Sequence, residues 1–303
     1  MRYNLRFAEP RTSDPEELAE LSLMWKSLHE VYGDKIVLLG QKETPEENDI
    51  IFGLPTMKQR VFSNNWLNED YHEIDAFRQR VSRAFSVCDY QEAEEFVKFL
   101  SYKGKGAFIK SVNQKEYTGS GEAGKSLVYI MGAHAISFCD RRGKSLIVQE
   151  KVSFSHEYRC IVVDGEVVTS SPVLHKATPF DVTHPAFRGL DPSEILFADP
   201  KSDYGDFVHE PGLTGEMLAM ADEIASGSNM VSGTIDIGLM NGKDIEPIEM
   251  NIGWPGHYGL FLCDPRIIAE ESVHIFNEKV LSNLFGEKAE EPDIEDDEEW
   301  LDP

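Results

Sequence analysis

Apolar residues recur along the chain at two spacings, every second residue in short runs and every third or fourth residue in longer ones. The first spacing predicts half-buried strands, and the second predicts amphipathic helices. Both kinds of segment alternate through the whole chain, and no apolar run approaches the length of a membrane span. The pattern therefore predicts a globular α+β protein that does not insert into membranes.

The first 75 residues have the pattern of a small α/β unit. An amphipathic helix is predicted over Asp14–Tyr32, where apolar residues recur at helical spacing and Asp14 and Pro15 are typical of a helix start. Short strands are predicted around this helix at Tyr3–Phe7, Lys35–Leu39 and Asp49–Gly53. We expect this unit to border a cleft rather than to carry the chemistry.

Basic residues occur in two of the next elements. A helix is predicted over Ile74–Phe85, and its three arginines face either solvent or a phosphate group. After another predicted helix, Tyr90–Tyr102, a strand at Ala107–Val112 places Lys110 among apolar neighbours. An ammonium group in such a strand needs an anionic partner, because burying it unpaired is costly. A phosphate group is a candidate for that partner.

Residues 119–126 match the Walker A pattern GxxxxGK[ST]. That pattern needs a strand directly before it and a helix directly after it, but Asn113–Tyr117 is polar and Leu127–Met131 has a strand-like composition. We therefore interpret the match as accidental. The glycine-rich stretch, which contains Gly119 and Gly121, can still close over phosphates through its backbone N–H groups.

The strongest local signal is a predicted β-hairpin. Its turn lies within Asn241–Asp244, since Asn-Gly between apolar runs is typical of a hairpin turn. A two-residue turn would place Asp236 opposite Pro247, and a four-residue loop would place it opposite Glu249. The predicted strands are Thr234–Met240 and Ile245–Asn251.

This hairpin brings acidic side chains together in either pairing. Asp236, Glu249 and Asn251 share one face, and only a bulge with an odd shift would separate them. Facing carboxylates destabilise a sheet unless a positive group offsets them. Two carboxylates and a carboxamide are oxygen ligands that suit Mg²⁺ held between protein and phosphates. The alternative is a solvated outer face, against which the apolar neighbours on both strands argue.

Two predicted strands in the middle of the chain are joined by a short turn, with Glu150 before it and Glu157 after it. The seven-residue step between these glutamates suits two side chains that flank one ligand. Arg159 shares a strand face with Glu157, because side chains alternate along a strand. Residues 175–211 are rich in Pro and Asp and are predicted to form a long insertion. Helices are predicted beyond it at Leu213–Ser226 and Asp264–Leu284.

The composition limits the partners and the compartment. The 303 residues carry a net charge of −25, which disfavours nonspecific binding to nucleic acid or anionic membranes. The 4 cysteines are widely spaced and no secretion signal is predicted, so we expect a cytoplasmic protein without disulfides. Acidic residues dominate 287–303, and we expect this tail to be disordered, either as a solubilising tail or as a docking peptide around Trp300.

Several of these features, taken in order, resemble the ATP-grasp family, and in particular D-alanine–D-alanine ligases, other carboxylate–amine ligases and a clade from phages and bacteria. The features are Lys110, the glycine-rich stretch, the step from Glu150 to Glu157, and Asp236, Glu249 and Asn251 followed by Pro255 and Gly256. The resemblance covers about residues 90–285. It implies an α+β ATP-grasp fold, in which two α/β subdomains grip ATP. The implied divisions are an N-terminal α/β unit at 1–88, an ATP-grasp domain at 89–285 and an acidic tail at 286–303.

The resemblance also implies roles for the matching positions. Residues that would contact ATP are Lys110 and the stretch Thr118–Gly124 with Gly119 and Gly121 for the phosphates, Gln149, Glu150, Lys151 and Val152 for adenine, and Glu157 for the ribose hydroxyls. Residues that would hold one or two Mg²⁺ ions are Asp236, Glu249 and Asn251. The turn Gly253–Gly256 would lie beside the acceptor site.

One position departs from the pattern of the family. Many carboxylate–amine ligases have an arginine two residues before the first metal-binding aspartate, and this chain has Thr234 there. If a cation is needed at this point of the site, Arg159 or Lys176 would have to supply it from a neighbouring strand. We therefore expect one of these two side chains to be the catalytic cation.

The function implied by the resemblance is an ATP- and Mg²⁺-dependent ligase. It would form an amide or peptide bond through an acylphosphate and release ADP, with small-molecule, peptide or protein substrates. One alternative is a nucleotide-binding assembly factor without ligase activity, as in an ATP-grasp-like chaperone of a eukaryotic translation initiation factor. Another is a P-loop NTPase or kinase that uses Lys125 and Ser126. The oligomeric state is left open.

Overall fold

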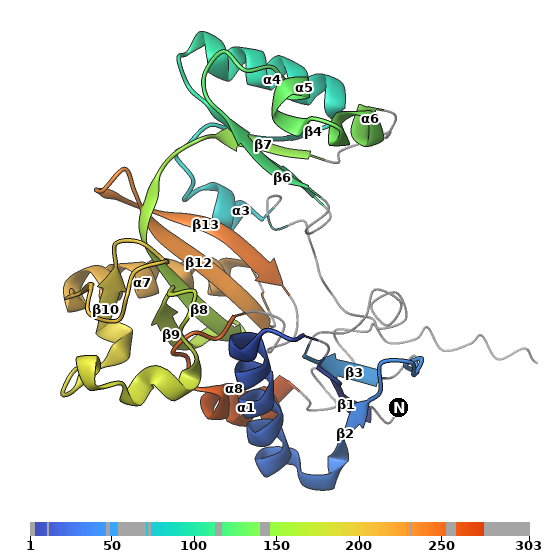
Figure 1. The fold of residues 1–303 in the computed structure, drawn as a ribbon, viewed down its shortest axis with the longest axis vertical. Helices are drawn as coiled ribbons and strands as arrows, with labels where there is room; N and C mark the ends of the chain where they lie inside the picture. The colour runs from blue at the N-terminus through green and yellow to red at the C-terminus, as the bar shows by residue number, and fades with distance from the viewer. Residues whose placement is uncertain are drawn as a thin grey trace, which may run out of the picture.

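Three sheets of three or four strands organise the described part of the chain. The computed structural model describes residues 4–10, 12–46, 49–53, 71, 74–112, 117–139, 146–228, 230, 232–252 and 259–275. A parallel sheet near the N-terminus and an antiparallel central sheet form the body of the molecule, and a second antiparallel sheet forms an upper lobe (Figure 1).

The N-terminal unit is a parallel sheet in the order β2-β1-β3. One long helix, α1 (Pro15–Tyr32), connects β1 to β2 in the sequence. Asp14 caps α1 by accepting hydrogen bonds from the N–H groups of Glu16 and Glu17, as the sequence predicts. Helix α1 packs against α8 (Pro265–Ile275), so segments from both ends of the described chain share one core (Figure 1). The strands and the short 3₁₀ turn of this unit are β1 (Asn4–Ala8), η1 (Gly33–Lys35), β2 (Ile36–Leu39) and β3 (Asp49–Phe52).

The upper lobe is the sheet β4-β7-β5-β6 together with three helices that cover one of its faces. Ile109 and Val148 point into the core beneath these helices. Side chains alternate, so Lys110 and Gln149 lie on the opposite face, toward the central sheet. The elements are β4 (Phe85–Cys88), α4 (Tyr90–Tyr102), β5 (Ala107–Ser111), β6 (Thr118–Gly121), α5 (Leu127–Met131), α6 (His134–Cys139) and β7 (Leu146–Glu150).

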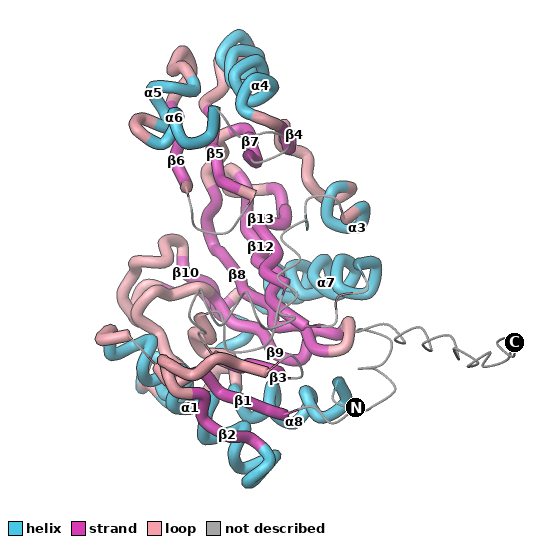
Figure 2. Tube along the Cα trace, turned by 90° about the vertical axis from the view of Figure 1, so that its right-hand side faces the viewer, coloured by secondary structure: helices cyan, strands magenta, loops and turns pink. Residues whose placement is uncertain are grey.

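The central sheet has the order β13-β12-β8-β9, and helix α7 (Pro211–Ser228) covers one face of it (Figure 2). Ile235, Ile237 and Met250 point toward α7 and are fully buried there. Polar side chains therefore lie on the other face, which is turned toward the N-terminal unit and the upper lobe. The strands are β8 (Phe154–Val163), β9 (Glu166–Pro172), β12 (Ser232–Met240) and β13 (Asp244–Ile252).

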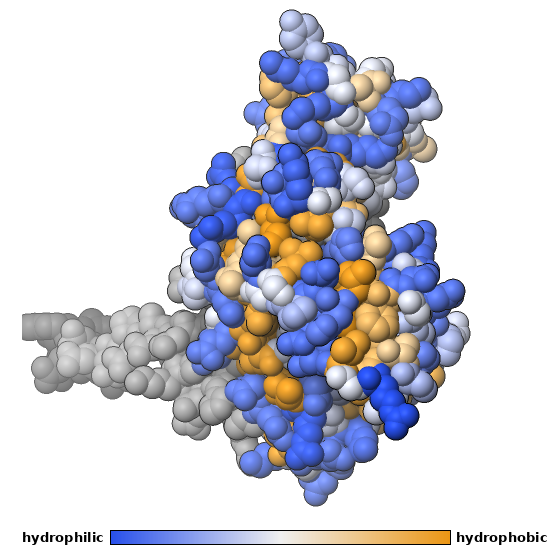
Figure 3. All heavy atoms as spheres, turned by 90° about the vertical axis from the view of Figure 1, so that its left-hand side faces the viewer, coloured by the Kyte–Doolittle hydropathy of each residue, from blue (hydrophilic) through white to orange (hydrophobic). Residues whose placement is uncertain are grey.

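The predicted insertion at 175–211 is an ordered segment with an aromatic core of its own. Phe187 packs edge-on against Phe197 and Phe207, with ring centroids 6.4 and 5.5 Å away. On the side of the molecule that carries α7 and this insertion, hydrophobic side chains gather over the body, whereas the upper lobe is mostly hydrophilic (Figure 3). Its elements are η3 (Pro179–Thr183), η4 (Pro185–Phe187), η5 (Pro192–Glu194), β10 (Ile195–Phe197) and β11 (Phe207–His209).

Two predicted elements are wrong. The helix expected over Ile74–Phe85 is only α3 (Asp75–Arg78), because the chain beyond it extends to bond to β13 and then enters the upper sheet as β4. Leu127–Met131 is a short helix rather than a strand. Ser126 caps it by accepting a hydrogen bond from the Tyr129 N–H, and the two end residues are buried together at helical spacing.

Candidate functional site

The turn of the central hairpin has neither of the two lengths, two or four residues, that the sequence left open. Met240 pairs with Asp244, so the turn has three residues, and Asn241 adopts φ 51° within it. Without correction this register would place Asp236 opposite Ile248. Ile248 is instead an unpaired bulge residue: Ile237 pairs with Pro247, and Asp236 pairs with Glu249. From the sequence, a bulge was the one irregularity expected to separate the carboxylates; combined with a three-residue turn, the bulge instead brings them opposite each other.

Each of the two facing carboxylates has its own cation. Arg159 on β8 forms a bidentate ion pair with Asp236, with Nε 2.7 Å from Oδ1 and Nη2 2.7 Å from Oδ2. Lys110 Nζ reaches across from the upper sheet and lies 2.6 Å from Glu249 Oε2. The second pair therefore joins the two sheets at the point where they face each other.

The amide of Asn251 extends this cluster along β13. Its Nδ2 donates to Glu249 Oε1 at 3.2 Å and to Thr234 Oγ1 at 3.3 Å. Thr234 therefore contacts the cluster through a hydroxyl, where many relatives of the resembled family have an arginine. The predicted trio Asp236, Glu249 and Asn251 is assembled on one face.

Burial and neighbouring charges shift the pKa values of these groups. Burial opposes ionisation of Glu249, but the Lys110 ammonium, the Asn251 amide and Arg159 together outweigh it and hold the pKa of Glu249 below its usual value. Burial opposes the charged form of Lys110, but attraction to Glu249, Tyr71 and Asp236 together outweighs it and raises the pKa of Lys110. On β8, burial and then the charges of Asp236 and Glu249 raise the pKa of Glu157 to about 7. Glu157 thus remains partly protonated near neutral pH.

The predicted adenine segment lies where the chain passes from the upper sheet to the central sheet. The Lys151 N–H donates to the Gly106 carbonyl at 2.9 Å, and the Glu150 N–H donates to the Ala84 carbonyl at 2.7 Å. The Glu150 carboxylate is 2.7 Å from Lys105 Nζ, and Lys151 forms an ion pair with Glu122. Gln149 faces the central sheet, whereas Val152 is partly exposed in the connection to β8.

The glycine-rich stretch is mostly strand rather than open loop. Gly119 pairs with Ile109, and Gly121 packs so closely that a Cβ there would lie 2.6 Å from Ile130 Cγ1. Lys125 is exposed, with Nζ 4.1 Å from the centre of the Tyr129 ring. Two of the N–H groups that a phosphate would use in a Walker A loop already have acceptors. Gly124 donates its N–H to Ser101 Oγ at 3.0 Å, and Lys125 donates its N–H to the Glu122 carbonyl at 3.2 Å.

Of the two cations expected to replace the missing arginine, only Arg159 reaches the cluster within the described residues. Lys176 lies exposed in a turn after β9, where its carbonyl accepts a hydrogen bond from Tyr204 Oη at 3.3 Å. Arg159 Nη1 also donates to the Gly259 carbonyl at 3.0 Å, and its guanidinium lies 5.1 Å from the centre of the Phe261 ring. The predicted acceptor turn Gly253–Gly256 and the acidic tail lie outside the described residues.

Glu20 is a site neighbour that the sequence analysis missed. From α1, one of its carboxylate oxygens accepts hydrogen bonds from the N–H groups of Leu260 and Phe261, both at 2.9 Å. Phe261 has a left-handed φ of 50°, so this carboxylate stabilises an unusual backbone beside Arg159. Burial raises the pKa of Glu20 to about 7, although the two N–H groups and Arg159 oppose the shift. No local signal distinguishes Glu20 from the other polar residues of its helix.

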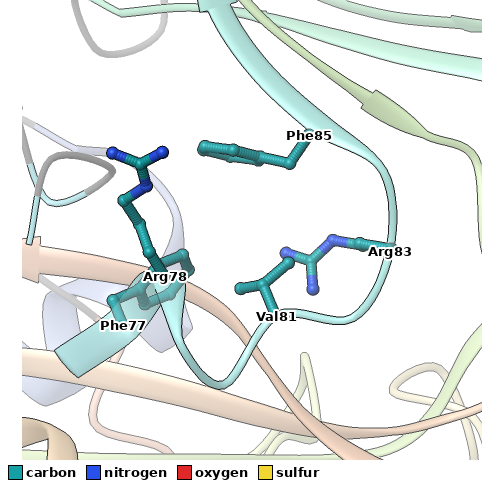
Figure 4. Close-up of a pocket in the computed structure, with 5 residues that line it drawn as sticks. All are labelled: Phe77, Arg78, Val81, Arg83 and Phe85. Carbon is teal, nitrogen blue, oxygen red and sulfur yellow. The ribbon is translucent and has the colours of Figure 1, made fainter. Parts of the chain in front are cut away.

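Arg83 is the second residue whose place was missed. It appears in the sequence as one of three arginines of a predicted helix, but its side chain is buried against β13. Beside it is a cavity of about 150 Å³, with Arg78 and Arg83 on opposite sides (Figure 4). The other lining residues are Phe77, Val81 and Phe85.

Comparison with known proteins identifies the family. Residues 81–265 match the model of the ATP-grasp domain, R2K clade family 2. The chain belongs to the ATP-grasp superfamily. D-cycloserine synthetase DcsG has a similar structure, with a TM-score of 0.54 at 12% identity over 89% of this chain and 98% of that one. D-alanyl-alanine synthetase A from Vibrio cholerae aligns with a TM-score of 0.52 at 13% identity, over 94% and 100%.

The predicted ATP-grasp fold is thereby confirmed, with the upper lobe and the central sheet as its two α/β halves. No curated protein sequence matches the chain. Among the helices of the described ranges, none has the length and apolar character needed to cross a membrane. The domain boundaries and the roles of individual residues in this ATP-grasp protein stay predictions.

The donor set of the ATP-grasp protein fits a hard divalent cation that is only partly held by the protein. In the described ranges, no three His, Cys, Asp or Glu side chains come together as a metal cage. Asp236 and Glu249 face each other beside the Asn251 amide, which supplies oxygen ligands but leaves several positions to be filled. Mg²⁺ is commonly bound in this way, by one or two carboxylates together with substrate phosphates and water.

Glu20 predicts a pH dependence of stability. Because its pKa in the folded protein is about 7, the folded chain keeps a proton between about pH 4.5 and 7 that the unfolded chain has lost. This group should therefore lower the free energy of unfolding as pH rises through that window, by about 2 kcal/mol once its partial exposure is allowed for. Urea unfolding of wild type and Glu20→Gln from pH 5 to pH 8 measures the difference. If the free energy of unfolding had the same pH dependence in both proteins, the raised pKa of Glu20 would be contradicted.

Proposed function

We propose that this protein is an ATP- and Mg²⁺-dependent ligase that joins a carboxylate to an amine, with the nucleotide between the upper and central sheets. The observation that carries the proposal is the pair of facing carboxylates, Asp236 and Glu249, each bound to a cation from a different strand. Membership of the ATP-grasp superfamily supports the reaction class.

Lys110 is proposed to exchange partners when ATP binds. Its ammonium is now held by Glu249, at a contact between the two sheets. A nucleotide phosphate is a better partner for this cation once Mg²⁺ neutralises the carboxylate. We infer that Lys110 then binds phosphate oxygens while Asp236, Glu249 and Asn251 hold one or two Mg²⁺ ions, which neutralise the phosphate charge.

The rest of the nucleotide is assigned to the passage between the sheets. Gln149, Glu150, Lys151 and Val152 would border the adenine, largely through backbone groups, because the charged side chains there are engaged in ion pairs. Glu157 would accept hydrogen bonds from the ribose hydroxyls. The strand with Gly119 and Gly121 would cover the phosphates from the edge of the upper sheet.

The proposed reaction is a phosphoryl transfer followed by an acyl transfer. A substrate carboxylate oxygen attacks the γ-phosphorus of ATP, the bond to ADP breaks, and an acylphosphate forms. The amine then attacks the acyl carbon, phosphate leaves, and an amide remains. Arg159, fixed by Asp236 and the Gly259 carbonyl, is placed to stabilise negative charge beside the carboxylates. It is our candidate for the role of the arginine that Thr234 replaces.

The substrate class is proposed from the surroundings of the site. The N-terminal unit reaches the cluster through Glu20, and the loop that this residue holds contacts Arg159. Two proteins of similar structure are named as D-cycloserine synthetase and D-alanyl-alanine synthetase A. Small carboxylates and amines such as amino acids, and peptides that present the same groups, are therefore the first substrates to test.

Nucleotide binding gives the first prediction. Glu249→Gln and Asp236→Asn should weaken Mg²⁺-dependent ATP binding by more than the roughly 10–100-fold typical of outer-shell changes, because each removes a negative charge and one of two oxygen donors from the proposed metal site. Lys125→Ala, at the exposed Walker A-like lysine, should change it less than about 2-fold. Titration calorimetry measures all four proteins. Loss of binding in Lys125→Ala, with binding retained in Glu249→Gln, would instead favour a P-loop protein.

Turnover gives the second prediction. With Mg²⁺, ATP and pooled amino acids, polyamines and peptides, the wild type should release ADP and phosphate and form a condensed product visible by mass spectrometry. Glu249→Gln should give neither, because phosphoryl transfer needs the metal site. Tight Mg²⁺–ATP binding without turnover in any pool would contradict the ligase proposal. That result would favour an assembly factor.

A further inference from the structure

A buried arginine outside the carboxylate cluster contacts the bulge that aligns the cluster. Arg83 Nη1 donates to the Pro247 carbonyl at 2.8 Å, and Nη2 donates to the Ile248 carbonyl at 3.1 Å. Ile248 is the residue without a partner on β12, and Pro247 is the paired residue before it. One guanidinium therefore bonds to two consecutive carbonyls where the register of the hairpin changes.

Arg83 is itself fixed by two further side chains. Nη1 lies 3.0 Å from Glu246 Oε2, and the side chains of this pair are only 1% and 3% exposed. The Ser82 N–H donates to Glu246 Oε1 at 3.0 Å. Nε donates to Gln149 Oε1 at 2.9 Å, on strand β7 of the upper lobe. A charged pair buried so fully adds little net stability, so its contribution lies in the geometry that it fixes.

The register of β13 depends on this bulge. Without it, the three-residue turn would pair Asp236 with Ile248, and Glu249 would point to the opposite face, toward α7. Lys110 would lose its partner, and the carboxylates would no longer face the same space. Whatever stabilises the bulge therefore also stabilises the arrangement of Asp236 and Glu249.

We propose that Arg83 is a positioning residue for the carboxylate pair, acting through the Pro247 and Ile248 carbonyls to keep Glu249 opposite Asp236. The consequence for Mg²⁺ rests on the proposed function, in which this pair holds the metal. Arg83 touches neither carboxylate. Its Nε holds Gln149, which we place beside the adenine, so its effect on metal affinity should exceed any effect on metal-free nucleotide binding.

Two variants separate positioning from simple loss of a buried charge. Arg83→Met with Glu246→Gln removes both charges but leaves an acceptor for the Ser82 N–H. Arg83→Lys keeps the charge opposite Glu246 but has no planar fork to reach two carbonyls. The matched control is Arg80→Met with Glu223→Gln, which removes an ion pair from the same segment to α7, with side chains 46% and 58% exposed.

The experiment measures ATP binding by calorimetry, at a series of Mg²⁺ concentrations and without Mg²⁺, with folding checked by circular dichroism. In both Arg83 variants, the Mg²⁺ concentration that gives half of the maximal gain in ATP affinity should rise about 10-fold or more. Supporting residues of metal sites give changes of this size. Metal-free ATP affinity should fall by a smaller factor, since Arg83 reaches the proposed adenine segment only through Gln149, and the control should match wild type throughout.

An unchanged Mg²⁺ dependence in a folded Arg83 variant would overturn the inference, and so would an equal loss of metal-free ATP affinity. If the double variant fails to fold, Arg83→Lys decides the question alone. Glu249→Gln separates this inference from the proposed function. Loss of Mg²⁺ dependence in Glu249→Gln but not in the Arg83 variants rejects only the positioning role, whereas a wild type without Mg²⁺-dependent ATP binding rejects both.

Discussion

Two carboxylates that face each other across one strand pair are the constraint on which the rest of this structure depends. Asp236 and Glu249 repel each other, and charges this close are costly to keep away from water. Arg159 offsets one from the neighbouring strand, and Lys110 offsets the other from the facing sheet. The second ion pair also joins the two sheets. A ligand that binds Glu249 in place of Lys110 therefore changes the contact between the two sheets.

The groups that hold this pair in place come from distant parts of the sequence. Arg83 bonds to the backbone of the bulge in β13, more than 160 positions along the chain. Glu20, on the first helix, binds the N–H groups of a loop 240 residues later, and that loop contacts Arg159. Binding of Mg²⁺ and nucleotide at the carboxylates is therefore coupled, in our proposal, to the N-terminal unit through Glu20 and to the upper lobe through Lys110.

Sequence patterns were sufficient to predict structure where the signal is local, or where the spacing of residues resembles that of a known family. The Asp14 cap and the ATP-grasp fold were predicted in this way and are confirmed. The bulge at Ile248 was not predictable, because no local pattern shows it and the Arg83 side chain that bonds to it lies 165 residues earlier in the chain. The strand-like composition of Leu127–Met131 was outweighed by the Ser126 cap and by packing against the upper sheet. The roles of the individual site residues stay predictions.

The most direct test is a crystal structure with Mn²⁺ in place of Mg²⁺ and a non-hydrolysable ATP analogue. The anomalous signal of Mn²⁺ distinguishes the metal from water and from lighter ions. Our account predicts a peak between Asp236 and Glu249, with Lys110 Nζ moved from Glu249 to a phosphate oxygen. A triphosphate bound at residues 119–126, or a metal peak away from both carboxylates, would contradict it.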